Sequence, residues 1–145
     1  MNWEASAPHL WAYLPLNRQE LLAVVAAMCA ALGMKTGMPE IVITDDAGSE
    51  ECNRAHLGCP GPTNVLSFPL TAQSAASGVM GSLVLSVPVL RREALLYGQE
   101  PAGHCIRLLA HGLAHLAGFK HGPEMWELCG RLEEAGRRAA FGLNA

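Results

Sequence analysis

Three histidines in the C-terminal third of the chain have the types and spacing of a metal site. His111 and His115 are four residues apart in the apolar run 108–116, and His121 follows six positions later. Residues four apart on a helix share one face, so the first two imidazoles can reach one ion. Gly118 lies before His121, and glycine accepts the left-handed backbone that ends a helix and turns the chain. The pattern therefore predicts three imidazoles around one point, at a helix end and its following turn.

Three neutral imidazoles form the ligand set of a catalytic zinc site that keeps a fourth position open for water. Zn²⁺ lowers the pKa of such a water to about 7, so His111 and His115 would act in catalysis through the metal-bound water. Ni²⁺, Cu²⁺ and Fe²⁺ also suit imidazole ligands. We expect one Zn²⁺ per chain. The other histidines have no such partners in the sequence and are expected to be ordinary core or surface residues: His9, His56 and His104.

The histidine spacing is similar to that of the metzincin proteases, with one important difference. Those enzymes carry glutamate directly after the first histidine, where it acts as general base, and this chain has Gly112 there. Without that carboxylate, peptide hydrolysis by the usual route is disfavoured. A metzincin-like zinc site is expected, and a protease is the weaker interpretation.

The surrounding segments predict the elements that position the histidines. A helix over 100–116 carries His111 and His115 and ends before Gly118. Strands and helices mix without regular alternation, which indicates an α+β fold with a small mixed β-sheet packed against helices. The capping-box pair Asn17 and Glu20 precedes a helical run over 21–32. The other predicted elements are strands over 39–44, 64–69 and 79–87, helices over 45–57, 88–97 and 123–141, and loops over 58–63 and 70–78.

Composition limits the class of protein. The 145 residues are 50% hydrophobic and 16% charged, which suits one core in a single domain over 1–145. A net charge of −3 provides no basic field for nucleic acid, so RNA binding would need a local patch. Arg91, Arg92 and Arg107 would form such a patch if folding brought them to the histidines. Paired arginines otherwise belong to a solvated face.

The five cysteines are odd in number and include no Cys-x-x-Cys pair, which favours reduced thiols in a cytoplasmic protein. The spacing of Cys52, His56 and Cys59 matches no standard zinc pattern, so these are expected to be isolated side chains. The sequence shows neither a signal peptide nor an apolar run long enough for a membrane span, so no membrane partner is expected.

The segment HGLAHLAGFKH at 111–121 resembles the H-G-x-L-H-L-x-G-[YF]-D-H signature of the YbeY family, single-domain, metal-dependent bacterial endoribonucleases. Two further motifs fit that resemblance. Asn53 is followed nine residues later by PTNVLSFP at 62–69, a family segment, and GSLVLS at 81–86 is a weaker match to a Gly-acid-Ile strand. Together the matches cover most of residues 17–140.

The resemblance implies a zinc site beside a groove and single-strand-specific cleavage of RNA, especially at the 3′ end of the small-subunit ribosomal RNA precursor. It also implies a role in ribosome quality control, with ribosomal RNA as partner and ribosomal proteins or a ribosome-associated GTPase as further partners. The second motif makes Asn64 and Ser67 candidates for substrate binding. The Ser67 hydroxyl could equally bond to backbone.

Several family positions differ in this chain. The family arginine four residues after the motif asparagine is Leu57 here, the aromatic before it is His56, and the acids at two other positions are Lys120 and Ser82. RNA cleavage requires neutralisation of the charge that develops on the phosphorane, usually by a metal or a guanidinium. Arg54 could replace the family arginine on the same helix face, as a catalytic and substrate-binding residue, or it could be a solvated surface charge.

Lys120 would weaken metal binding by repulsion, help to bind a phosphate, or point to solvent.

The sequence supports three interpretations of function. A zinc-dependent endoribonuclease is the first. A non-catalytic, zinc-containing ribosome assembly factor is the alternative, supported by Leu57. Another metallohydrolase, such as a protease, is the third and is disfavoured by Gly112.

Overall fold

A computed structural model describes residues 3–5, 8–33, 39–57, 64–69 and 81–142 of the chain. Along the sequence, strands and helices follow one another in an irregular order. The elements are β1 (Trp3–Ala5), the 3₁₀ helix η1 (Pro8–Tyr13), α1 (Arg18–Ala31), β2 (Glu40–Thr44), α2 (Asp46–Leu57), β3 (Val65–Pro69), β4 (Gly81–Ser86), α4 (Val87–Leu96), α5 (Pro101–Leu116) and α6 (Pro123–Phe141).

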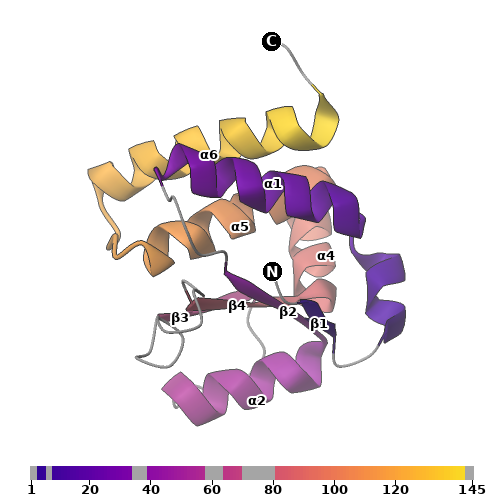
Figure 1. Ribbon diagram of the computed structural model, residues 1–145. Coiled ribbons are helices and arrows are strands. Elements are labelled where there is room, and N and C mark those ends of the chain that lie inside the picture. Colours follow the sequence, from indigo (N-terminus) through magenta and orange to yellow (C-terminus); the bar gives the residue numbers. More distant parts are fainter. Residues whose placement is uncertain (1–2, 6–7, 34–38, 58–63, 70–80, 143–145) are drawn as a thin grey trace.

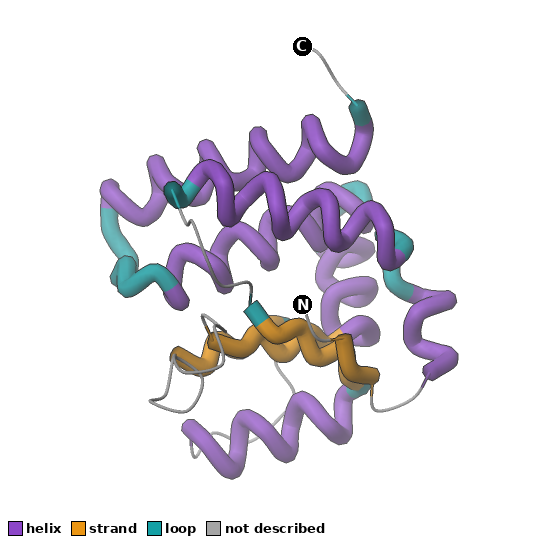
Figure 2. The backbone as a smooth tube through the Cα atoms, in the orientation of Figure 1, coloured by secondary structure: helices purple, strands orange, loops and turns teal. Residues whose placement is uncertain are grey.

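A small mixed sheet forms the centre of the fold. Its strand order is β1-β2-β4-β3, with β1, β2 and β4 parallel and β3 antiparallel to β4. Helices α1, α5 and α6 lie over one face of the sheet, and α2 lies across the other (Figure 1). The tube in Figure 2 shows the strands enclosed between these helical layers. The predicted α+β fold with a small mixed sheet is therefore confirmed.

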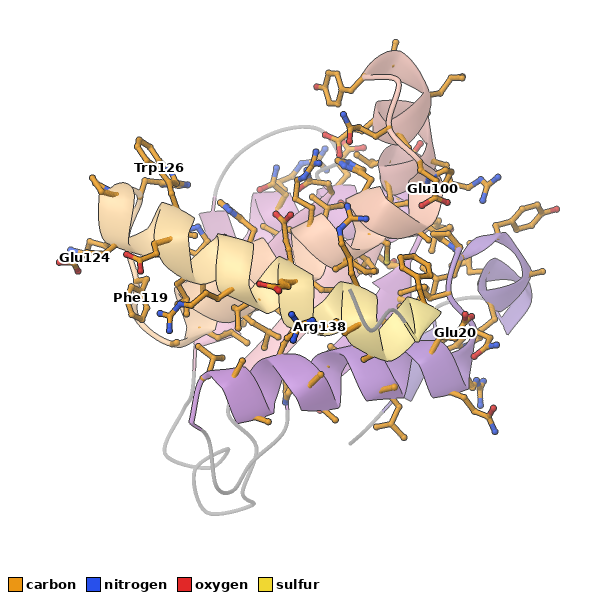
Figure 3. All side chains as sticks on the ribbon, turned by 90° about the horizontal axis from the view of Figure 1, so that it is seen from above. Glu20, Glu100, Phe119, Glu124, Trp126 and Arg138 are labelled. Carbon is orange, nitrogen blue, oxygen red and sulfur yellow. The ribbon has the colours of Figure 1, made fainter. Side chains whose placement is uncertain are left out.

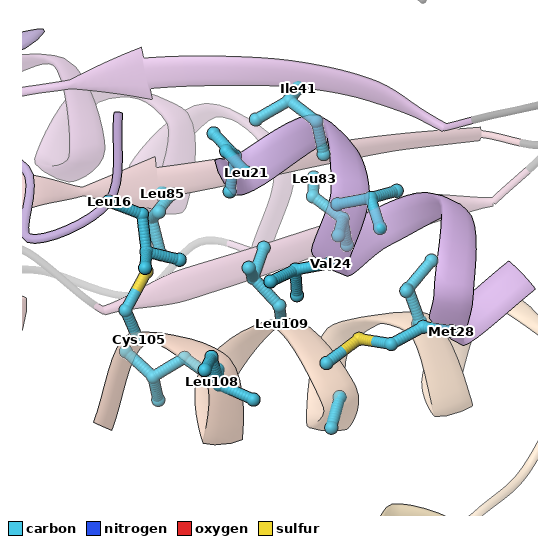
Figure 4. Close-up of a cluster of buried hydrophobic side chains, with 14 of the residues drawn as sticks. Leu16, Leu21, Val24, Met28, Ile41, Leu83, Leu85, Cys105, Leu108 and Leu109 are labelled. Carbon is cyan, nitrogen blue, oxygen red and sulfur yellow. The ribbon is translucent and has the colours of Figure 1, made fainter. Parts of the chain in front are cut away.

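The core lies between α1, α5 and the upper face of the sheet. Leu21, Val24 and Met28 of α1 are fully buried, as are Leu83 of β4 and Leu109 of α5. Figure 4 shows these side chains meeting between the strands and the two helices. Burial of each such side chain contributes about 1.5–3 kcal/mol, so this layer fixes α5 on the sheet.

Local signals set the helix starts. Asn17 Oδ1 accepts from the Glu20 backbone N–H at 2.8 Å, and Glu20 Oε1 accepts from the Asn17 N–H at 2.9 Å. This confirms the predicted capping box at α1. Ser86 ends β4 and caps α4, since its Oγ accepts from the Val89 N–H at 3.4 Å. Because β4 runs directly into α4, the predicted strand over 79–87 ends at Ser86.

Other predicted elements occur within one to three residues of their expected bounds. The N-terminal β1 and η1 were not predicted, because a three-residue strand has too short a pattern to detect. The predicted loops over 58–63 and 70–78 fall on residues outside the described ranges. In the described part of the chain, no helix combines the length and hydropathy of a membrane span.

Candidate metal centre and adjoining groove

Helix α5 and the turn after it position all three histidines. Pro101 starts the helix, and the Glu100 carboxylate accepts from the backbone N–H groups of Ala102 and Gly103 at 3.2 and 2.8 Å. At the other end, the Phe119 N–H donates to the Ala114 carbonyl at 3.1 Å across Gly118. This bond pattern is a Schellman motif, which needs a left-handed residue at its centre.

Gly118 supplies that conformation with φ +95°, and the chain then reverses toward the helix. The reversal brings His121 back beside His111 and His115. The ring centroid of His121 lies 5.3 Å from that of His111 and 4.9 Å from that of His115. The turn predicted from the glycine position is therefore present, and it gathers the three imidazoles.

The three imidazoles have the arrangement of a ligand set. One ring nitrogen of each histidine lies within 4.8 Å of those of the other two. The Nε2 atoms of His111 and His115 are 3.1 Å apart. Two nitrogens bound to a tetrahedral zinc ion at its usual bond lengths are about 3.4 Å apart. His111, His115 and His121 therefore fit a zinc ion with an open fourth position.

The electrostatics of the cluster also suit a cation. Burial, followed by the charges of His115 and His121, holds the pKa of His111 below its ordinary value. A lowered pKa favours the neutral imidazole that binds metal. His115 lies in the last turn of α5, where the helix dipole presents its negative end.

Gly112 faces the sheet and not the cluster. A Cβ at this position would lie 2.8 Å from Leu83 Cδ2, 3.3 Å from Val65 Cγ2 and 3.4 Å from Ser67 Oγ. Leu83 is fully buried and cannot move aside freely. At the position that holds the general base in metzincins, α5 therefore packs closely against β3 and β4, and a side chain there would have to displace Leu83.

A groove of about 680 Å³ runs beside the histidines, between α5 and β3. Val65 and Ser67 of β3 form one wall, and His111 and His115 form part of the other. The Ser67 hydroxyl donates to the Gly112 carbonyl at 3.0 Å. That bond ties β3 to α5, while the oxygen of Ser67 can still accept a hydrogen bond from a ligand. The full lining consists of Asn64, Val65, Leu66, Ser67, Arg107, Leu108, His111, His115 and Leu116.

Asn64 lines the same groove, but its side chain is held by the protein. Its Nδ2 donates to both carboxylate oxygens of Glu93, at 3.0 and 3.2 Å, and its Oδ1 accepts from the Val65 N–H at 2.6 Å. Glu93 Oε1 also lies 3.1 Å from Nε2 of the buried His104. Asn64 therefore joins a polar network behind the groove, and substrate binding by Asn64 and Ser67 remains a prediction.

The arginines do not gather as one patch. Arg54 is exposed on α2 and pairs with Glu50, on the face of the sheet away from α5 (Figure 1). Arg92 pairs with Asp46 at 2.9 Å, and Arg91 donates to the Tyr13 carbonyl at 2.8 Å. Of the arginines within the described residues, Arg107 is the one that lines the groove. Arg91, Arg92 and Arg107 therefore do not form a patch at the histidines, because the two α4 side chains bind elsewhere.

The remaining predicted positions can also be placed. Arg54 does not lie among the groove-lining residues, and Leu57 is the last residue of α2, with its side chain outside the described part. Lys120 is exposed and lines a second hollow of about 620 Å³ with His121 and Phe119. Phe119, Glu124 and Trp126 lie at this same end of the molecule (Figure 3). Lys120 therefore lies beside His121 in this hollow and does not line the groove between α5 and β3.

Comparisons with known proteins agree with this fold and site. The family model described as endoribonuclease YbeY matches residues 15–134. A curated endoribonuclease YbeY from Nitratidesulfovibrio vulgaris is 46% identical, with 88% of this chain and 87% of the relative covered. One from Oleidesulfovibrio alaskensis is 40% identical, with 77% and 78% covered.

A solution structure of a Thermotoga maritima protein shares the fold, with a TM-score of 0.61 at 18% identity over 94% of this chain and 88% of that one. The chain is thus an α+β protein with a candidate metal site of three histidines. The chain belongs to the endoribonuclease YbeY family.

Proposed function

We propose that this chain is a zinc-dependent endoribonuclease that cleaves single-stranded RNA in the groove between α5 and β3. The observation that carries the proposal is that His111, His115 and His121 converge on one point, with two of them in the wall of the groove. The chain's membership of an endoribonuclease family supports RNA as the substrate.

The residues have separate tasks in this proposal. His111, His115 and His121 hold the ion, which when bound supplies Lewis-acid stabilisation of the phosphate and an activated water. The backbone path of β3 presents Ser67 to the substrate, and its hydroxyl oxygen accepts a hydrogen bond from the RNA. Because Gly112 carries no carboxylate, the protease interpretation lacks its general base.

In the cell, we propose that the chain acts in the cytoplasm on the 3′ end of small-subunit ribosomal RNA and in ribosome quality control. Ribosomal proteins or a ribosome-associated GTPase would be its partners. These finer assignments are supported by the family resemblance of the two motifs, at 62–69 and 111–121.

The test is cleavage of labelled single-stranded and double-stranded RNA of the same sequence by purified protein, before and after removal of metal. Cleavage of the single strand, its loss with a chelator and its return with Zn²⁺ would support the proposal. The His115→Ala variant should be inactive. Equal cleavage by this variant would show a contaminating nuclease.

One observation favours a second candidate, a non-catalytic zinc-containing assembly factor. The family arginine is Leu57 here, and Arg54 lies away from the histidine cluster. Co-sedimentation with ribosomal subunits, together with no cleavage of any RNA by zinc-loaded protein, would establish this alternative.

A further inference from the structure

We propose that Arg107 binds an RNA phosphate beside the metal site and so supplies the positive charge that is absent at Leu57. This inference rests on the proposed function, because it assigns a substrate contact within the same groove. Its support comes from the place of Arg107 on α5, from the contacts that hold its side chain, and from the partners of the other arginines.

Arg107 shares a helix face with two of the metal-ligand candidates. Arg107, His111 and His115 are successive positions four apart on α5, and all three line the groove. The helical rise places neighbouring members of this row about 6 Å apart along the axis. A strand of RNA that placed one phosphate at the histidines would therefore bring a neighbouring phosphate within reach of a long side chain one turn away.

Two contacts hold the guanidinium at the rim of the groove. Arg107 Nη2 donates to Gln99 Oε1 at 3.0 Å, and Nε lies 3.8 Å from Glu133 Oε1. The Glu133 contact is longer than a hydrogen bond. The Arg107 side chain is 42% exposed, and a guanidinium carries five N–H donors in a fixed fork. Donors therefore remain for a phosphate, and the side chain is already oriented.

The partners of the other arginines make this assignment specific. Arg54 pairs with Glu50, Arg92 with Asp46, and Arg91 with the Tyr13 carbonyl. Among the described residues that line the groove beside His111, none of these three arginines occurs. Since the net charge of −3 opposes RNA binding, a cation within the groove has a large effect on affinity.

The experiment measures binding of a fluorescent single-stranded RNA to full-length protein in EDTA, so that no cleavage occurs, over a series of salt concentrations. Arg107→Gln is compared with Arg138→Gln, which removes the same charge from an exposed Arg138–Glu134 pair on α6. We expect Kd to rise about tenfold for Arg107→Gln and to change little for Arg138→Gln. The salt slope should fall by about 0.7 with loss of one phosphate contact to a single strand.

Arg107→Lys keeps the positive charge but loses the forked donors of the guanidinium. Its Kd for the RNA should lie between those of wild type and Arg107→Gln. Equal Kd and salt slope for Arg107→Gln and Arg138→Gln would overturn the inference and leave Arg107 as a clamp between Gln99 and Glu133. If wild-type protein still cleaves RNA in that case, the proposed function stands. Wild-type protein that neither binds nor cleaves RNA would overturn both.

Discussion

The amide of Asn64 donates to both carboxylate oxygens of Glu93, at 3.0 and 3.2 Å. Through this contact, the residue that directly precedes the groove-lining strand β3 is tied to α4. Glu93 also bonds His104 of α5, so one carboxylate of α4 is linked to α5 and to the residue before β3. The Asn64 side chain thus supports the groove wall, and its role in substrate binding stays a prediction.

Loss of this support should lower stability. Asn64→Ala removes the donor to Glu93 and leaves a part-buried carboxylate without it, which costs about 1–3 kcal/mol. Urea unfolding of wild type and variant measures the difference. Arg54→Ala, at an exposed ion pair, serves as control and should change stability by less than about 1 kcal/mol. Equal losses in the two variants would show that the Asn64–Glu93 contact contributes little.

A side chain at Gly112 should be destabilising. In Gly112→Ala, the new Cβ meets Cδ2 of the buried Leu83 at 2.8 Å, so Leu83 or α5 must shift at a cost of about 1–3 kcal/mol. Gly130→Ala is a matched control, because its added Cβ on α6 meets no atom of the other described segments within 4 Å. That variant should gain about 0.5–1 kcal/mol from helix propensity. Thermal unfolding shows whether each variant is more or less stable than wild type. Stabilisation of both variants would contradict the close packing at Gly112.

The turn after α5 should control metal affinity. Gly118 has φ +95°, and an added Cβ would meet no atom of the described residues other than its chain neighbours within 4 Å, so Gly118→Ala meets backbone strain of about 1–2 kcal/mol. Relief of that strain moves His121 away from the other ligands and weakens Zn²⁺ binding. Competition with a fluorescent zinc chelator measures the affinity, with Gly130→Ala again as control. Unchanged zinc affinity in Gly118→Ala would mean that the turn does not set the position of His121.

Stability should fall in alkali because of one buried thiol. Burial raises the pKa of Cys105 from its ordinary 9.0 to about 12. The unfolded chain therefore ionises this thiol first, and the free energy of unfolding falls by about 1.4 kcal/mol per pH unit between about pH 9 and about pH 12. Below about pH 9, the full stability is present.

The Cys105→Ala variant isolates this effect, because every other group titrates in both proteins. Urea unfolding from about pH 8 to about pH 10 should show a steeper decline for wild type than for the variant. Parallel declines would show that the thiol is not protected from ionisation in the folded state.

The histidine cluster could be predicted from the sequence because its determinants are local. His111 and His115 lie on one helix face, and Gly118 alone permits the turn that returns His121. The capping pair Asn17 and Glu20 fixed the start of α1 by the same kind of short-range bond. The helical spacing of residues, together with the residue types that cap and end helices, was sufficient to predict these features.

The surroundings of the site depend on contacts between distant segments, which no local pattern encodes. Asn64 pairs with Glu93, 29 residues away, and Ser67 with the Gly112 carbonyl, 45 residues away. The face of α5 that carries Arg107 forms a groove wall because β3 lies beside it, and this pairing is not visible in the sequence. An arginine four residues before His111 was the available signal, since it marks the same helix face.

The most direct test of the metal centre is the metal content of purified protein, measured by mass spectrometry on wild type and His121→Ala. We predict about one zinc ion per wild-type chain, and loss of that zinc from the variant, because His121 is the ligand that the Gly118 turn supplies. Wild-type protein that retains no metal after exposure to zinc and gel filtration would contradict the three-histidine centre. So would His121→Ala protein that keeps its zinc in full.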